Sequence, residues 1–214
     1  MISPTARIYP NVQLGENVEV DDFVILGVPP RGRAEGELPL VIGDNAVIRS
    51  HTVIYAGNII GNGFQTGHHA MIREENRIGN DVSIGTNSVV EHHVEISDRV
   101  RIHSQAFVPE FSTLEEGVWV GPNVVLTNVY HPLCPKAKPC LKGATLKRGA
   151  KIGANSTILP YVVIGKNALI GAGSMVVHDV PDRAVAAGNP AKVIKTIDEL
   201  TCQTGLIDSP YGDV

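Results

Sequence analysis

The side chains of this sequence best suited to proton transfer or metal binding are eight histidines and three cysteines. His131 stands next to Pro132, and Cys134 and Cys140 follow in the same stretch. An imidazole titrates near neutral pH and is a good general base, whereas an imidazole with two thiolates can hold zinc. The spacing matches no known zinc finger, and zinc would remove His131 as a free base. A solvated loop histidine is the third possibility at this stage.

A six-residue period governs the elements that must position these side chains. Every sixth residue is aliphatic through residues 2–26, 42–126 and 146–176, with Thr66 as the one exception. Helices need a period near 3.6 and strands a period of two, so a period of six indicates a short strand followed by a sharp corner. Three such sides complete a coil, and Gly and Asn recur at the corners, where the backbone needs unusual conformations. The sequence predicts an all-β, three-sided parallel β-helix with stacked aliphatic residues inside.

Two stretches interrupt the repeat and return to it out of phase. Residues 27–41 and 127–145 should therefore leave the prism as loops, and loops of this length are usually functional or disordered. We expect the first to shape an acceptor pocket, in which Arg31 and Arg33 could meet a nucleotide diphosphate or simply balance nearby glutamates. The second carries His131.

The C-terminal part follows a different pattern. The repeat stops after Val180, and Gly188-Asn189-Pro190 is typical of a helix start with Pro in the first turn. A short helix from there would pack on the coil through Ile194, Ile197 and Thr201. The predicted organisation is a β-helix over residues 1–187 and a helix with a tail over 188–214.

Residues 18 apart should share one corner or side of the prism. One predicted corner column is polar, and it either binds a ligand or satisfies the turn backbone: His51, His69, Asn87, Gln105 and Asn123. Another column sets a histidine between carboxylates, which would favour its charged form: Glu74, His92 and Glu110, with Glu75, His93 and Phe111 beside it. That column could bind an amino sugar, but we favour a structural ion-pair ladder between subunits.

Three stretches carry more than the generic repeat: residues 118–132 (VWVGPNVVLTNVYHP), 149–160 (GAKIGANSTILP), and 170–181 (IGAGSMVVHDVP) followed by 187–194 (AGNPAKVI). They resemble the left-handed β-helix acyltransferases, and among these the N-acetyltransferases of nucleotide-linked amino sugars. The resemblance implies a left-handed coil, against the usual crossover rule. It also implies a homotrimer with active sites between neighbouring prisms. Acetyl-CoA or a related acyl-CoA would be the cosubstrate, with no metal in catalysis.

Acyl transfer from a thioester needs a proton acceptor, donors that polarise the carbonyl, and two substrates held together. Galactoside and serine acetyltransferases of this fold place their catalytic histidine in a similar His-Pro context, so the resemblance implies that His131 is the base. Several amino-sugar relatives lack this histidine and rely on the substrate amine. The position that contacts the acceptor corresponds to Gln105, with His103 nearby.

The same resemblance implies a CoA site. Ala154 and Ala172 match positions whose backbone contacts the pantetheine arm, where small residues allow close approach. Basic positions near the adenosine phosphates correspond to Lys192 and Lys195. The spacing of 18 between Arg148 and Lys166 places further positive charge on one outer column.

The favoured function is N-acetyl transfer to a nucleotide-linked amino sugar, and O-acetyl transfer to a sugar or small hydroxyl acceptor is the alternative. The γ-class carbonic anhydrases share the fold but pair two zinc ligands as HxxxxH, which is absent here. A non-catalytic scaffold is disfavoured by the CoA-groove motifs. The acceptor itself and the length of the acyl group are not readable from the sequence.

Composition excludes several other classes. A net charge of −4 gives no basic surplus for nucleic acid. No apolar run approaches the roughly 18 residues of a membrane span, and the N-terminal residues lack the apolar stretch of a signal peptide. The odd cysteine count without a CxxC motif suggests a reduced intracellular chain. We therefore expect a cytoplasmic protein.

Overall fold

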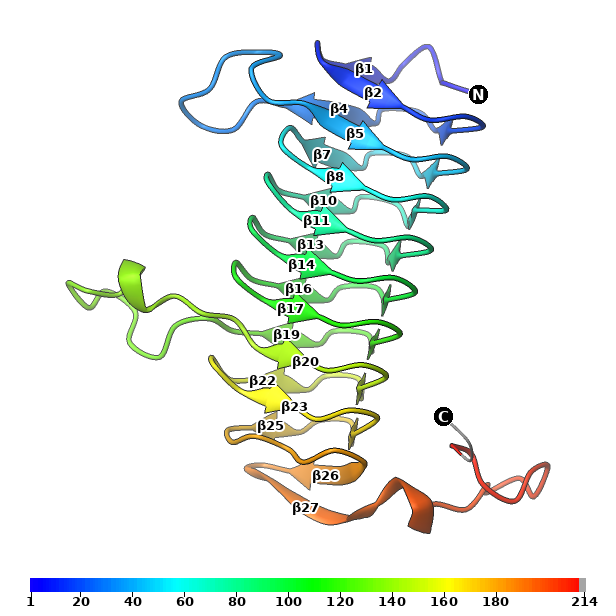
Figure 1. Ribbon diagram of the computed structural model, residues 1–214, viewed down its shortest axis with the longest axis vertical. Helices are drawn as coiled ribbons and strands as arrows, with labels where there is room; N and C mark the ends of the chain where they lie inside the picture. Colours follow the sequence, from blue (N-terminus) through cyan, green and yellow to red (C-terminus); the bar gives the residue numbers. More distant parts are fainter. Residues whose placement is uncertain (212–214) are drawn as a thin grey trace.

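The computed structural model describes residues 1–211 and forms a three-sided prism of stacked coils (Figure 1). Each coil contributes one short strand to each of three sheets, and strands pair in parallel with the strand one coil away. Met71, for example, pairs with Val53 and with Val89, which lies 18 residues further on. The predicted three-sided parallel β-helix is confirmed.

We name the sheets I, II and III in the order in which the chain visits them. Sheet I contains β1 (Arg7–Ile8), β4 (Ile25–Val28), β7 (Val53–Tyr55), β10 (Met71–Ile72), β13 (Val89–Val90), β16 (Phe107–Val108), β19 (Val125–Leu126), β22 (Thr157–Ile158) and β25 (Met175–Val176). Sheet II contains β2 (Val12–Leu14), β5 (Leu40–Ile42), β8 (Ile59–Ile60), β11 (Arg77–Ile78), β14 (Glu95–Ile96), β17 (Thr113–Leu114), β20 (Thr145–Leu146) and β23 (Val163–Ile164). Sheet III contains β3 (Glu19–Val20), β6 (Val47–Ile48), β9 (Gln65–Thr66), β12 (Ser83–Ile84), β15 (Arg101–Ile102), β18 (Trp119–Val120), β21 (Lys151–Ile152), β24 (Leu169–Ile170), β26 (Ala184–Gly188) and β27 (Ala191–Thr196).

The core is a column of aliphatic side chains inside the prism. In most strands the second residue points inward and is buried, as Ile72 and Ile84 are. The exception in the repeat, Thr66, is also buried, and its hydroxyl accepts a hydrogen bond from the Arg49 amide at 2.9 Å. Its oxygen lies 3.1 Å from that of Thr52. A polar residue fits here because its hydroxyl has partners within the prism.

Most corners turn through one residue with positive φ. The polar column predicted from the 18-residue spacing occupies this position at the corner between sheets III and I, which we call the III/I corner. His51, His69 and Gln105 adopt φ values of 64°, 57° and 62° there. The rings of His51 and His69 stack with centroids 4.6 Å apart. The position explains why Asn is frequent in this register, because Asn tolerates the left-handed region better than most residues.

Both predicted loops leave the prism at the corner between sheets I and II, the I/II corner (Figure 1). The first runs over residues 29–39, between β4 and β5, and the second over residues 127–144, between β19 and β20. Each is slightly shorter than the sequence interruption suggested, because the flanking strands extend into it. The second loop contains a 3₁₀ turn, η1 (Lys138–Cys140). Both loops therefore lie at the same corner of the prism.

The C-terminal helix expected from Gly188 is wrong. Asn189 and Pro190 form the turn of a hairpin, in which β27 runs antiparallel to β26 at the end of sheet III. The helical part is a 3₁₀ turn, η2 (Ile197–Glu199), whose Ile197 is buried while Ile194 is exposed. The hairpin satisfies the backbone groups of the last strand edge, which a helix would have left unpaired. It also crosses the expected boundary between residues 187 and 188.

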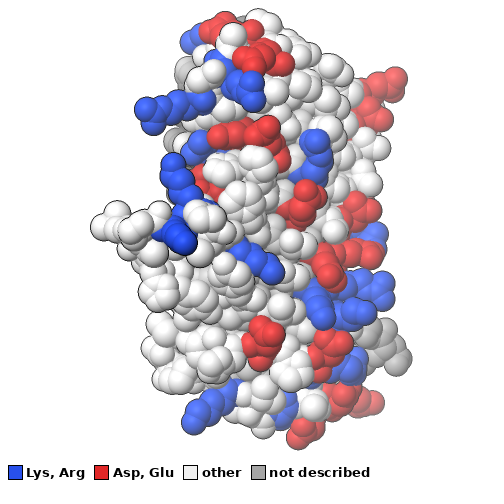
Figure 2. All heavy atoms as spheres, turned by 60° about the vertical axis from the view of Figure 1, so that its left-hand side comes forward, with Lys and Arg blue, Asp and Glu red and all other residues white. Residues whose placement is uncertain are grey.

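The outer face of sheet I is largely apolar. Met71, Phe107, Val125 and Met175 are all at least 36% exposed on it. On the side of the molecule that Figure 2 shows, acidic and basic side chains are interspersed, and broad areas carry no charge. Within residues 1–211, none of the helical turns is long and apolar enough to span a membrane.

Candidate functional site

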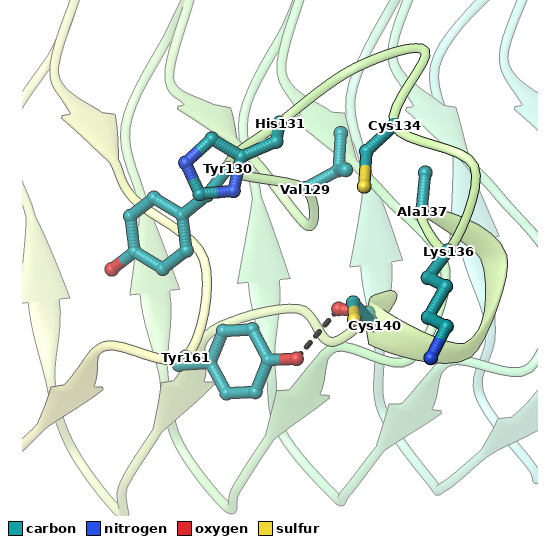
Figure 3. Close-up of a pocket in the computed structure, with 8 residues that line it drawn as sticks. All are labelled: Val129, Tyr130, His131, Cys134, Lys136, Ala137, Cys140 and Tyr161. Carbon is teal, nitrogen blue, oxygen red and sulfur yellow. Dashed lines mark hydrogen bonds between the residues drawn. The ribbon is translucent and has the colours of Figure 1, made fainter.

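The second loop encloses a cavity of 380 Å³ (Figure 3). The amide of Cys134 donates to the carbonyl of His131 at 3.2 Å, that of Ala137 to Cys134 at 2.9 Å, and that of Cys140 to Ala137 at 3.0 Å. Residues three apart share one side of such successive turns. All four of these residues line the cavity, with Val129, Tyr130, Lys136 and Tyr161.

Tyr161, at the I/II corner of the next coil, fastens this loop to the prism. Its hydroxyl donates to the carbonyl oxygen of Cys140 at 2.6 Å. Its ring stacks with that of Tyr130 at a centroid distance of 6.0 Å, and the Lys142 ammonium lies 5.6 Å from the ring centroid. Sequence reasoning missed Tyr161, although it occupies a positive-φ corner position (φ 66°) where a Tyr is unusual.

His131 is exposed at the mouth of this cavity, beside Tyr130, with ring centroids 6.3 Å apart. Its imidazole has no hydrogen-bond or ion-pair partner among residues 1–211 of this chain. A catalytic base is usually oriented by a third group. Within residues 1–211 no such group is in place for His131. In the same described part, no three side chains of the ligand types are arranged to hold a metal ion.

His103 and Gln105 lie at the III/I corner. His103 packs on Trp119 with ring centroids 4.7 Å apart. Burial and, secondarily, the positive charge of Arg101 lower the pKa of His103, which favours its neutral form. Gln105 is exposed, and its backbone amide donates to the carbonyl of Thr86 at 2.8 Å. The predicted pair is therefore brought together, but on the opposite edge of sheet I from His131.

Ala154 and Ala172 continue the III/I corner toward the C-terminal end. The coils stack so closely that a Cβ on Gly153 would lie 2.5 Å from the Ala172 amide nitrogen. Lys192 pairs across the hairpin with Ala187, which lies against Gly171, and Lys195 pairs with Val185. Ala154, Ala172 and Lys192 thus follow one edge of the prism.

Arg148 and Lys166 lie elsewhere, at the corner between sheets II and III. Arg148 lies 3.9 Å from Glu116, which also pairs with Arg99. The width of sheet III separates this corner from Ala154. The six residues assigned to CoA by sequence therefore fall into two groups in a single chain.

The histidine–carboxylate column at the I/II corner is an ion-pair ladder. His92 lies 3.6 Å from Glu110, and His93 lies 3.4 Å from Glu75. Glu74 instead receives the Arg73 guanidinium at 2.8 Å. Burial would raise the pKa of Glu74, but this hydrogen bond and charge outweigh it and lower the pKa. The contact of His92 with Glu110 follows the predicted column, whereas Glu74 pairs with Arg73 instead of His92, and these contacts lie within one chain.

The ladder also supports the second loop, because Asn128 at the loop base donates to the Glu110 carboxylate at 2.7 Å.

The first loop is remote from this region. It leaves sheet I five strands before the second loop, which is about 24 Å along the prism. Arg33 there pairs with Glu37 at 2.6 Å, the charge-balancing alternative raised by the sequence.

Comparison with known proteins bears on the repeat first. Residues 77–110 and 143–178 match the family model for the bacterial transferase hexapeptide (six repeats). The two matched segments comprise 70 of the 214 residues, so what the chain shares with this family is the hexapeptide repeat itself. The matched segments are coils on either side of the second loop, so His131 lies in an insertion between hexapeptide repeats.

Three proteins with sequence similarity to this chain are named acetyltransferases. The 2,3,4,5-tetrahydropyridine-2,6-dicarboxylate N-acetyltransferase of Clostridium perfringens is 44% identical over 39% of the chain and 33% of its own length. The galactoside O-acetyltransferase of Lactococcus lactis is 37% identical over 41% of the chain and 44% of its own length. The dTDP-3-amino-3,6-dideoxy-alpha-D-galactopyranose 3-N-acetyltransferase of Aneurinibacillus thermoaerophilus is 45% identical over 30% of the chain and 33% of its own length. The chain thus matches less than half of each relative.

A solved structure supports the fold over a longer span. The UDP-N-acetylglucosamine acyltransferase of Arabidopsis superposes with a TM-score of 0.56 over 92% of the chain and 74% of its own length, at 16% identity. This likeness concerns the fold, a left-handed parallel β-helix, as the sequence resemblance implied.

Proposed function

We propose that this protein is an acetyl-CoA-dependent acetyltransferase, and that it acetylates the amino group of a nucleotide-linked amino sugar. We further propose that it works as a homotrimer in the cytoplasm. The names of its relatives support acetyl transfer, and one of them acts on a dTDP-linked amino sugar.

One observation carries this proposal: the two groups of candidate residues flank the apolar face of sheet I within one coil of each other in height. The loop with His131 follows β19 directly. The III/I corner that precedes β19 lies one coil from His103 and Gln105 and one coil from Ala154. The chain therefore carries the proposed base on one edge of sheet I, and the proposed acceptor and CoA positions on the other.

A closed ring would join the two halves. If three copies turn their sheet I faces toward a common axis, the III/I corner of one copy meets the I/II corner of the next. Rotation about an axis parallel to the prism leaves heights unchanged, so His131 would approach Gln105 of the partner subunit. Burial of the exposed apolar side chains on sheet I would stabilise this ring.

The reaction then follows from the residues at the joined corners. The acceptor amine attacks the thioester carbon, its proton passes to His131, and the C–S bond breaks to release the CoA thiolate, which takes up that proton. Gln105 would contact the acceptor, and backbone groups at Ala154 and Ala172 would hold the pantetheine arm. Lys192 and Lys195 would pair with the adenosine phosphates.

O-acetylation is the second candidate because the chain carries His131. A sugar hydroxyl is far less acidic than an ammonium group and needs a base to become nucleophilic. The relative from Lactococcus lactis, a galactoside O-acetyltransferase, is consistent with that chemistry.

Thiol release from acetyl-CoA with a panel of acceptors tests the proposal. We expect turnover with UDP- or dTDP-linked amino sugars and little with their hydroxyl analogues. Turnover with the hydroxyl sugars alone would replace N-transfer by O-transfer. No turnover with any acceptor, together with no calorimetric binding of acetyl-CoA, would contradict an acetyltransferase.

A further inference from the structure

A groove on the outer face of sheet III lies beside the III/I corner. It has a volume of 260 Å³ and includes Gln65, Ser83 and Arg101, which stand in register on β9, β12 and β15. His103 and Ser104 close it at the corner. One guanidinium, one amide, one imidazole and two serine hydroxyls therefore line a single concave surface next to the candidate acceptor position.

Arg101 has no carboxylate partner within residues 1–211. Its neighbours in register are Ser83 and Trp119, neither of which is charged. By contrast, Arg73 pairs with Glu74 at 2.8 Å and with Glu91 at 3.3 Å. A guanidinium without a carboxylate keeps its fork of donors for an oxyanion.

A comparable groove on sheet II provides the contrast. Its volume is 280 Å³, and it includes Arg77, which begins an Arg-Ile strand as Arg101 does. Arg77, however, stands in register with Glu95, and both line that groove. Concave grooves thus recur on the prism. In the sheet II groove a carboxylate stands in register beside the arginine, whereas no acidic residue lines the sheet III groove.

We propose that the sheet III groove binds an oxyanion of the acceptor, with Arg101 as its main ligand and Ser83 and Gln65 as further donors. This inference rests on the proposed function, because it places the reacting end of the acceptor near Gln105. Arg101 stands two residues before His103 at the corner, and a strand rises about 3.3 Å per residue, so the anion would sit roughly 7 Å from the corner. That distance suits a pyranose with its reacting group at the corner and a phosphate at its anomeric carbon. A carboxylate of the acceptor has the same oxyanion chemistry.

Direct titration tests the groove without relying on activity. Pyrophosphate, UDP and succinate are titrated calorimetrically into the wild-type protein, Arg101→Gln and the matched control Arg77→Gln. We expect Arg101→Gln to weaken the preferred anion by on the order of 10-fold, because a charge-assisted bidentate contact is lost. Arg77→Gln should stay within about twofold, and both variants should melt like wild type, since both side chains are on the surface.

The preferred probe identifies the source of the anion. Tighter binding of pyrophosphate or UDP assigns a phosphorylated acceptor, and tighter binding of succinate assigns a carboxylate. Unchanged binding in Arg101→Gln, equal losses in both variants, or no binding of any probe to wild type would overturn the proposal.

Kinetics separate this inference from the proposed function. With an active acceptor, Arg101→Gln should raise the acceptor KM by on the order of 10-fold. The KM for acetyl-CoA should not change, and kcat should stay within about threefold. Anion binding that depends on Arg101, in a protein that acetylates nothing, would keep the groove and remove the acetyltransferase. A normal acceptor KM in an active Arg101→Gln enzyme would keep the acetyltransferase and remove the groove as its acceptor site.

Discussion

The two corners that flank sheet I differ in how much of their chemistry the chain completes alone. At the III/I corner, His103 is held against Trp119, and the Gln105 backbone is fixed by the coil above. At the I/II corner, His131 stands exposed on a loop, and no group of the described chain orients its ring. Regular coils therefore build the proposed acceptor and CoA side, whereas the proposed base lies on an insertion. The proposed trimer is the arrangement in which the second region would complete the first.

The largest expected effect comes from removing the base. His131→Ala should lower kcat/KM by on the order of 10²-fold or more, because the acceptor proton loses its receiver. Steady-state thiol release measures this. His178→Ala is the matched control, since His178 is an exposed histidine near the same corner below β25. Equal, small effects of both substitutions would leave His131 as a solvated loop residue.

Mixed assemblies test whether the two corners meet between subunits. His131→Ala and Gln105→Ala chains, each impaired alone, are unfolded together and refolded as mixtures. Random assembly leaves one intact His131 facing one intact Gln105 at about a quarter of the interfaces, so activity should recover to about that fraction. Absence of recovery from a mixture that does form trimers would mean that both residues act within one chain.

A negative charge on the outer face of sheet I should dissociate the proposed trimer and so separate the two corners that meet between subunits. Phe107 stands between Val89 and Val125 on the apolar face and is 36% exposed. Phe107→Asp would bury an unpaired carboxylate in the proposed ring, so we expect dissociation to monomers and at least about a 10-fold loss of activity. Sedimentation velocity measures the assembly.

The control for this substitution is Ile59→Asp on sheet II. Ile59 is 44% exposed and adjacent to Arg77, so an aspartate is tolerated there. Both variants should remain folded. A trimeric, active Phe107→Asp protein would remove sheet I from the interface and break the comparison between the two corners.

The CoA end of the III/I corner should show a smaller, donor-specific effect. Reversing Lys192 and Lys195 to glutamate should raise the KM for acetyl-CoA by on the order of 10-fold through lost phosphate pairing, with the acceptor KM unchanged. Reversing Arg148 and Lys166, on the far edge of sheet III, should change it less than about twofold. Equal effects of the two pairs would mean that the adenosine end crosses sheet III.

The fold was predictable because each register of the six-residue repeat occupies one structural position and therefore requires one type of residue. A single inward residue per strand must be aliphatic, and a single corner residue must accept positive φ, so both appear in the sequence as periods. The prediction for the C-terminal segment was wrong because Pro190 suits a helix start and a hairpin turn equally well. Only the open edge of sheet III decides between them, and that edge is a tertiary feature.

The site was predictable in its parts but not in its arrangement. Spacing placed Gln105 and Asn123 on one corner, and the resemblance assigned Ala154 to the CoA site. Neither could say that the loop with His131 begins across sheet I. Contacts outside the repeat were also invisible. Arg101 stands out only when its neighbours on other coils are known, and Tyr161 only when its hydroxyl is seen to reach the loop.

Tyr161 gives the finest test of how the loop corner is held. Tyr161→Phe keeps the ring on Tyr130 but removes the hydrogen bond to the Cys140 carbonyl, a contact worth about 1 kcal/mol. If that bond positions the loop, kcat should fall by roughly 3- to 10-fold while the KM for acetyl-CoA and the melting temperature stay near wild type, and tryptic cleavage after Lys136 should quicken. Tyr9→Phe, near the same corner of the first coil, is the control. A slower reaction without faster cleavage would assign Tyr161 to substrate contact, and an unchanged reaction would show that the loop holds His131 without this latch.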